Sequence, residues 1–369
     1  MTSTMVRGTG GGIAPRDFER AGPVVLFGSG ETSASGRKVY DWLFRRLPAE
    51  PRVAVLETPA GFQPNSALVA EKVADFLRTR LQNFRPRVAV VPARRRGSAF
   101  SPDDPTILAP LLQADAIFLG PGSPTYAARQ LENSLAWHYL LARYRLGAAV
   151  VLASAATIAA GTHALPVYEI YKAGEDLHWR PGLDFFGACG LSLILVPHWD
   201  NREGGAELDT SRCYMGGARF ETLMAMLPPE QTVVGIEEHT ALVVDAASAG
   251  CHVLGRGAVV VLRNGEERRF ESGRNFPLDL LGALRPPTSG DRVPAAVWRA
   301  VVAAKESQSA PTEHPPLRVV DLVERREAAR ARHDWAAADL LRAQVADLGW
   351  RIQDTPEGPR LSPVSERDG

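Results

Sequence analysis

This sequence has no excess of one charge, few cysteines and no long apolar run. Lys and Arg number 42, as do Asp and Glu, so no net charge favours nucleic acid, a membrane surface or an acidic polymer as partner. The cysteines form no C-x-x-C pair and no metal-ligand pattern, and their odd number argues against a disulfide framework. We therefore expect a protein of the reducing cytoplasm without bound metal or cofactor. The three cysteines are Cys189, Cys213 and Cys251.

The most apolar stretch, residues 148–160, is shorter than a bilayer requires and contains Ser and Thr, so no membrane helix is expected. Residues 1–20 lack the apolar core of a signal peptide, and their glycines predict a flexible lead-in. What remains is ordinary globular composition, 45% hydrophobic and 23% charged.

From Pro23 onward, short apolar runs alternate with amphipathic stretches. Residues 65–84 carry apolar side chains at helical spacing, with Asn65 as the predicted N-cap. Strands that are apolar throughout and separated by helices are typical of a mostly parallel, doubly wound α/β sheet. Ligands of such sheets sit beyond the carboxyl ends of the strands. The predicted strands span residues 24–27, 52–58, 87–91, 116–120 and 149–153.

The pattern changes after residues 191–201. A helix around 218–227 leads into short runs that predict antiparallel strands, and R-N-G-E-E is a hairpin signal. We therefore expect an antiparallel edge on the main sheet, within one domain over residues 21–285.

The C-terminal part divides into a linker and a small module. Residues 286–317 are rich in Pro, Ser and Thr and predict a linker, with a short helix at 295–305. Residues 318–362 predict two helices that break near His333 and Asp334, then Gly349 as a C-cap and a short hairpin.

One serine, Ser154, stands directly after the fifth predicted strand. A serine at the apex of a tight strand-to-helix turn presents its hydroxyl as a nucleophile, usually in the pattern G-x-S-x-G. Here the five residues are L-A-S-A-A, so Leu152 and Ala156 replace the glycines. On these residues alone, a serine that caps a buried helix is the simpler interpretation.

Two further segments favour a nucleophile. His198 follows an apolar run at 191–196, which places it at a C-terminal strand end as a candidate general base. The turn G-P-G-S-P follows the strand at 116–120. Backbone N–H groups of Gly122 and Ser123, with that of Ala155, are candidates for an oxyanion hole.

Taken in order, G-S-G-E, G-P-G-S-P-T-Y, the serine turn, P-H-W and T-V-V-G-I-E-E-H-T-A-L-V resemble the dipeptidase E and cyanophycinase group of serine peptidases. The resemblance covers residues 23–281. It implies the class I glutamine-amidotransferase-like fold and hydrolysis of small peptides, with aspartyl peptides and cyanophycin as substrates of the group. A catalytically degenerate, ligand-binding member of the fold is the alternative, because the turn lacks both glycines.

The resemblance also implies roles for matching residues. Ser154 matches the nucleophile, and His198 matches the general base. The acid of the dipeptidase branch lies about fifteen residues after the serine, where this chain has Glu169; a carboxylate there would orient the imidazole. Asp200 and Glu175 compete for that role. Further residues expected to line the site are Glu31, Asp200, Asn201 and Glu238.

Other motifs have weaker interpretations. G-S-G-E and G-P-G-S-P match neither G-x-G-x-x-G nor a Walker A sequence, so nucleotide binding is disfavoured. Glu31 either points into the cleft or caps a helix. Glu237, Glu238 and His239 superficially suggest metal ligands, but a loop that lines the site suits them better.

The tail carries a second resemblance. "ARARHDWAAAD", "LGW" and "DTPEG" within residues 318–362 resemble the C-terminal segment of cysteinyl-tRNA synthetases. No synthetase catalytic signature accompanies them. A helical hairpin for docking or dimerisation is the favoured interpretation, so a homo-oligomer stays open. Contact with RNA is the sharper alternative, and the mixed charge of the tail weakens it.

Overall fold

The computed structural model describes residues 21–285, 292–309, 316–355 and 358–363. The predicted flexible lead-in at residues 1–20 lies outside these ranges. The chain divides into two compact units, Met1–Lys305 and Glu306–Gly369.

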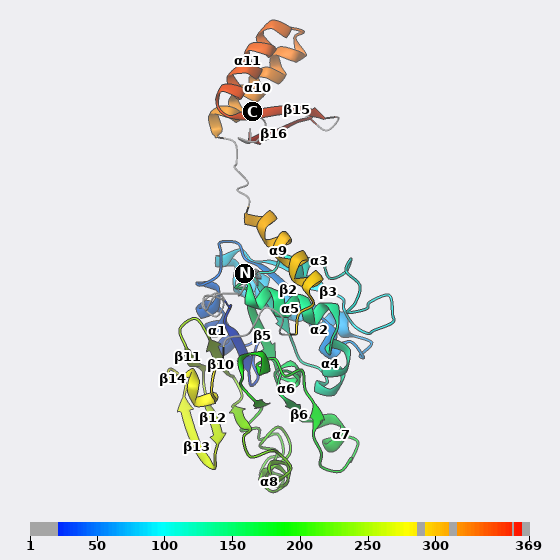
Figure 1. The fold of residues 1–369 in the computed structure, drawn as a ribbon, viewed down its shortest axis with the longest axis vertical. Coiled ribbons are helices and arrows are strands. Elements are labelled where there is room, and N and C mark those ends of the chain that lie inside the picture. Colours follow the sequence, from blue (N-terminus) through cyan, green and yellow to red (C-terminus); the bar gives the residue numbers. More distant parts are fainter. Residues whose placement is uncertain (1–20, 286–291, 310–315, 356–357, 364–369) are drawn as a thin grey trace, which may run out of the picture. The chain divides into compact units, whose positions relative to one another are not determined.

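The first unit is built on an 8-stranded sheet with the order β14-β11-β10-β1-β5-β4-β2-β3 (Figure 1). The five strands from β1 to β3 in this order run parallel, and β10, β11 and β14 add an antiparallel edge beside β1. The predicted fold class is therefore confirmed. The strands are β1 Val24–Phe27, β2 Arg52–Leu56, β3 Arg87–Val91, β4 Ala116–Leu119, β5 Ala149–Ala153, β10 Thr240–Asp245, β11 Gly250–Gly255 and β14 Asn275–Pro277.

Both faces of this sheet are buried, because successive side chains of a strand point to opposite faces. In β1, Val24 and Leu26 belong to one hydrophobic cluster, whereas Val25 and Phe27 belong to another. Helices α4 (Pro124–Leu131) and α5 (Leu135–Arg145) pack in the first cluster; α1 (Ala34–Phe44) and α2 (Ser66–Arg80) pack in the second. Asn65 stands at the N-cap position of α2, but its side chain makes no capping hydrogen bond.

A second sheet, which the sequence did not predict, has the order β13-β12-β9-β8. Strands β8 (Leu193–Val196) and β9 (Thr232–Ile236) are parallel neighbours; β12 (Ala258–Arg263) and β13 (Glu266–Glu271) continue antiparallel. The predicted hairpin turn joins β12 to β13 with Asn264 and Gly265, both at positive φ as a type I′ turn requires. The strand that precedes His198 thus belongs to this sheet and not to that of Ser154.

Short elements complete the first unit. They are η2 Thr58–Ala60, η3 Gln82–Phe84, α3 Ala109–Leu112, α6 Ala155–Ala159, β6 His163–Ala164, α7 Val167–Tyr171, β7 Arg180–Pro181, η4 Gly187–Cys189, α8 Gly217–Ala225 and η5 Leu278–Leu281.

The predicted linker contains a helix that belongs to the core. Helix α9 spans Ala295–Ser309, four residues longer than predicted. Its Val301 is fully buried in the same cluster as α5, and Lys305 donates a hydrogen bond to the Leu146 carbonyl. The predicted short helix of the linker is therefore confirmed, but its burial against α5 was not predicted from a composition of Pro, Ser and Thr.

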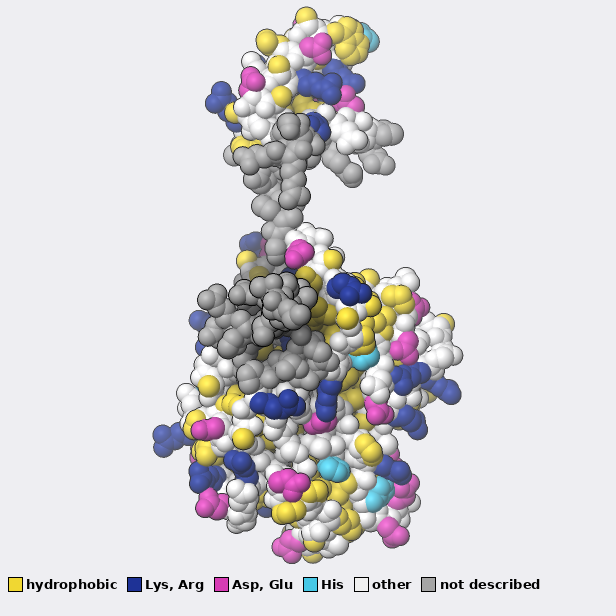
Figure 2. Space-filling view, in the orientation of Figure 1, with side chains coloured by type: hydrophobic (Ala, Val, Ile, Leu, Met, Phe, Trp, Pro, Cys, Tyr) yellow, Lys and Arg dark blue, Asp and Glu magenta, His cyan; other side chains and the backbone are white. Residues whose placement is uncertain are grey.

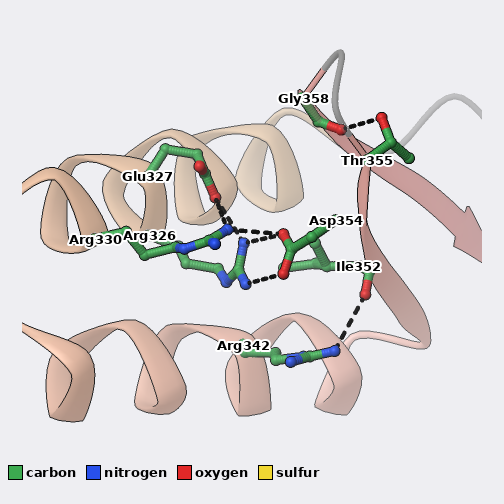
Figure 3. Close-up of polar contacts among 8 residues, drawn as sticks. All are labelled: Arg326, Glu327, Arg330, Arg342, Ile352, Asp354, Thr355 and Gly358. Atoms are coloured by element: carbon green, nitrogen blue, oxygen red, sulfur yellow. Dashed lines mark hydrogen bonds and ion pairs between the residues drawn. The ribbon is translucent and has the colours of Figure 1, made fainter.

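The C-terminal unit has the predicted elements. Helices α10 (Leu317–Ala331) and α11 (Trp335–Asp347) flank the break at Asp334, whose side chain accepts the Ala337 N–H at 3.0 Å. Gly349 follows at φ 79°, and β15 (Trp350–Thr355) pairs with β16 (Gly358–Pro363). A nearly buried guanidinium fastens helix to hairpin: Arg326 donates two 2.9 Å hydrogen bonds to the Asp354 carboxylate (Figure 3).

Over the described part of the chain, no helix is long and apolar enough to cross a membrane. Lys and Arg side chains are interspersed with Asp and Glu side chains over the face shown in Figure 2. The balance of charges in the sequence is therefore also seen on this face.

Candidate active site

The turn at Ser154 keeps the geometry of a nucleophile elbow without its glycines. Ser154 directly follows β5, lies at φ 52° and ψ −109°, and starts α6. Such a conformation is sparsely populated by residues other than glycine and persists only where the surroundings impose it. Leu152 and Ala156, the residues in place of the glycines, are almost completely buried and pack in the core.

Thr157 holds this turn in place. Its buried hydroxyl lies 3.1 Å from the Phe27 carbonyl and 3.0 Å from the Leu152 carbonyl, so it joins α6 to the ends of β1 and β5. The Ser154 N–H also donates to Phe27 O, at 3.4 Å. These contacts tether the turn to two neighbouring strands, although neither flanking position is glycine.

The hydroxyl of Ser154 meets a histidine and a carboxylate in line. Ser154 Oγ lies 3.0 Å from His198 Nε2, and His198 Nδ1 lies 3.0 Å from Glu238 Oε1. A carboxylate only accepts hydrogen bonds, so Nδ1 carries the proton and Nε2 accepts from the serine. This is the order of groups that nucleophilic acyl transfer uses.

The carboxylate of Glu238 is fixed from two sides. The Asn201 amide donates to the same Oε1 at 2.9 Å, and the Glu238 N–H donates to Asp200 Oδ1 at 2.7 Å. The hydrogen bond from His198, then that from Asn201, lowers the pKa of Glu238, although partial burial opposes the shift. Asp200 and Asn201 therefore hold the acid, and over the residues that the structure describes the hydrogen-bond partners of the His198 ring are Ser154 and Glu238 and not Asp200.

Glu169 does not occupy the position expected of the acid. It lies on α7, where Tyr168 and Tyr171 line the cavity at Ser154 and Glu169 lines a neighbouring cavity. Glu169 is absent from the lining of the cavity at Ser154, and the Nδ1 of His198 is already bound to Glu238. Glu175, the other competitor, pairs with Arg180 at 3.6 Å.

One expected oxyanion-hole donor is also already used. The Ser123 N–H donates to the Pro59 carbonyl at 2.9 Å, and its hydroxyl caps α4 by accepting the Tyr126 N–H. Within the described chain, the N–H groups of Gly122 and Ala155 have no acceptor, and both residues line the cavity at Ser154. Gly122 is at φ 154°, and a Cβ there would lie 1.9 Å from the Pro59 carbonyl oxygen.

The cavity at Ser154 has a volume of about 330 Å³. Sequence reasoning missed most of its wall, which includes Tyr168, Tyr171, Lys172, Glu203 and Tyr214. The Tyr214 ring lies 6.0 Å from that of His198 and 5.2 Å from that of Tyr171. The i, i+3 spacing of the two α7 tyrosines was a usable signal.

Tyr214 reaches the cavity by a route that no sequence pattern marks. It ends a run of three residues, Arg212 to Tyr214, that all have positive φ. The run is held against the histidine segment, because the N–H groups of Arg212 and Cys213 donate to the carbonyls of Trp199 and His198.

The remaining expected residues lie around the site. Burial raises the pKa of Glu31, while a backbone hydrogen bond and then the nearby imidazoles of His198 and His239 oppose the shift. Glu31 does not line the cavity at Ser154. Glu237, beside Glu238, binds Arg269 and accepts the Ala258 N–H, so these neighbouring carboxylates serve different partners.

Fold and geometry together define an α/β protein with a serine, a histidine and a glutamate aligned at the carboxyl ends of its strands. No family model matches the sequence. A solved peptidase from an acI-B1 Actinobacterium is similar in structure, with a TM-score of 0.56 and 19% identity, covering 70% of this chain and 97% of that one. At this identity the similarity shows that the two chains share a fold.

Parts of the sequence are similar to cysteine–tRNA ligases. The ligase of Rubrobacter xylanophilus is 35% identical over 125 residues, which are 34% of this chain and 24% of the ligase. That of Chlamydia felis is 46% identical over 54 residues, which are 15% and 11% of the two chains. This chain therefore spans a quarter or less of the length of these curated relatives.

Proposed function

We propose that this chain is a serine hydrolase of small peptides, as its resemblance to the dipeptidase E and cyanophycinase group implies. The observation that carries the proposal is the line of atoms from Ser154 Oγ through the His198 ring to Glu238 Oε1, with both contacts at 3.0 Å. A serine that only capped a helix would not need a strained backbone aimed at an imidazole.

The proposed reaction follows from these contacts. His198 Nε2 takes the Ser154 proton as Oγ attacks the peptide carbonyl, and the N–H groups of Gly122 and Ala155 stabilise the oxyanion. His198 then gives the proton to the leaving amine. Water, deprotonated by the same nitrogen, releases the acyl group and restores the serine. Glu238 orients the imidazole and stabilises its charged form throughout.

Peptide hydrolysis tests this function. A panel of dipeptides and tripeptides, including aspartyl peptides, is incubated with wild-type chain, Ser154→Ala and the surface control Ser98→Ala. We expect release of amino acids by wild type and Ser98→Ala, and a loss of about 10³-fold or more in Ser154→Ala. Turnover by Ser154→Ala equal to that of wild type contradicts the proposal, as does absence of turnover by folded wild-type chain. A wild-type chain that binds the peptides but does not cleave them would indicate a ligand-binding protein.

The expected setting is the cytoplasm. All three cysteines are buried free thiols, which suits a reducing compartment. Burial, the largest cause, raises the pKa of Cys213 and of Cys251, so neither is an activated thiolate.

A second candidate function concerns the C-terminal unit, because parts of the chain are similar to cysteine–tRNA ligases. Here the unit would contact tRNA. Both Lys or Arg and Asp or Glu side chains are visible on it in Figure 2, so a strong electrostatic contribution is not expected. Salt-sensitive tRNA binding that is lost on deleting residues 317–369 would support this role, and binding unchanged by the deletion would contradict it.

A further inference from the structure

A second and larger cavity adjoins the candidate active site. Its volume is about 910 Å³, within the range of ligand sites. Tyr168 lines both cavities. Ser123 lines the larger one, whereas its neighbours Gly122 and Pro124 line the cavity at Ser154. The two cavities therefore adjoin each other along the segment that carries the Gly122 N–H group.

Two guanidinium groups on the wall of the larger cavity have no acidic partner. Over the described part of the chain, no carboxylate lies within ion-pair distance of Arg95 or Arg129, and both residues are exposed. Their neighbours differ: Arg94 pairs with Glu57 at 2.7 Å, and Arg96 lies 3.4 Å from Asp103. Unpaired arginines in a concavity are suited to bind a carboxylate of a ligand.

The same wall holds two buried polar atoms without partners. Among the described residues, Glu169 Oε2 and Thr125 Oγ1 are inaccessible to solvent and make no hydrogen bond. Buried polar groups are nearly always satisfied. Neither atom is accessible in this structure, so a ligand that supplies the partner meets it only after the side chain turns toward the cavity. A carboxylate only accepts, so the group that meets Glu169 must donate a hydrogen bond.

We propose that the larger cavity binds the leaving-group side of the peptide and selects a residue that ends in a free carboxylate. This inference rests on the proposed function. The carboxylate is bound by Arg95 and Arg129 and accepts a hydrogen bond from the Thr125 hydroxyl, and the one amide N–H of the same residue donates to Glu169. The acyl part occupies the cavity at Ser154, and the scissile carbonyl lies at the Gly122 segment between the two spaces.

Binding measured without turnover tests this assignment. Ser154→Ala is titrated calorimetrically with the probes Asp-Ala and Ala-Ala, each as the free acid and as the C-terminal amide. We expect the free acids to bind more tightly than the amides, by about tenfold for loss of one charge-assisted contact. Adding Arg95→Gln and Arg129→Gln removes this preference, whereas adding Arg80→Gln, a change at an exposed arginine that lines neither cavity, keeps it.

The outcomes separate this inference from the proposed function. A preference for free acids that depends on Arg95 and Arg129, with no hydrolysis by wild type, supports the site and contradicts the peptidase. Hydrolysis of acids and amides at equal kcat/KM, unchanged in the arginine variants, supports the peptidase and overturns the site. Absence of binding by every probe also overturns it.

Discussion

His198 and Glu238 each stand two residues beyond the end of a strand, and those strands, β8 and β9, are parallel neighbours in one sheet. Their side chains meet at 3.0 Å because the register pairs Val196, the last residue of β8, with Gly235, the next to last of β9. The residues are 40 positions apart in the chain. The acid for His198 is therefore set by strand pairing and not by distance from the serine.

This relationship predicts which carboxylate matters for catalysis. We expect Glu238→Gln to lower kcat by up to about 10⁴-fold, because the amide neither stabilises the imidazolium nor enforces the proton on Nδ1. Glu175→Gln is the matched control, since Glu175 pairs with Arg180 outside the site. Steady-state kinetics on a cleaved peptide gives both values, and a Glu238→Gln enzyme as fast as the control would refute the assignment.

The strained backbone at Ser154 predicts an effect on stability. Ser154→Gly and Ser154→Ala both remove the hydroxyl, but only glycine readily adopts φ 52°. We expect the glycine variant to have the larger free energy of unfolding, by about 1 kcal/mol, after its own entropic cost is counted. Urea denaturation of the two variants measures the difference. An alanine variant of equal or greater stability would mean that the turn is not strained.

The ion pair in the C-terminal unit predicts a dependence on pH. The hydrogen bond and charge of Arg326 hold the pKa of Asp354 below its ordinary 3.8, so the pair stabilises the unit above that pH. The stabilisation is lost as pH falls through the lowered pKa. Because Asp354 is 41% exposed, we expect Asp354→Asn to cost about 1 to 2 kcal/mol at neutral pH.

Hydrogen exchange in α10 and β15 of the full chain measures this effect, with wild type and variant compared at each pH. The matched control is Asp321→Asn, which breaks an exposed pair with Arg325 at 3.7 Å and should change exchange little. A difference between wild type and Asp354→Asn that persists undiminished at pH 2 would contradict the expected titration.

Sequence patterns predicted well those parts of the fold that local chemistry determines. Residues 24–27, 87–91 and 149–153 are strands with the predicted bounds, and Asn264-Gly265 forms the predicted hairpin turn. The pairing of β8 with β9 in a separate sheet was not predictable, because the sequence of an apolar strand does not specify which other strand lies beside it. The prediction of Glu169 as the acid failed for a related reason. A spacing of fifteen residues after the serine does not specify in which direction a short helix aims its side chains.

The elbow shows a similar limit. The pattern L-A-S-A-A argued against a nucleophile because Leu152 and Ala156 replace glycines. The structure fits them by burying both side chains and by fastening the turn through Thr157 to two strands. One of these two contacts is to the carbonyl of Phe27, which lies 130 residues before Thr157 in the chain. No local sequence pattern includes so distant a residue.

Covalent labelling tests the central claim, that Ser154 is a nucleophile activated by His198 and Glu238, most directly. The full chain is treated with a fluorophosphonate, and the adduct is located by mass spectrometry of its peptides. The account predicts an adduct on Ser154, slower labelling of Glu238→Gln and none of Ser154→Ala. A folded wild-type chain that stays unlabelled, or an adduct that persists in Ser154→Ala, would contradict it.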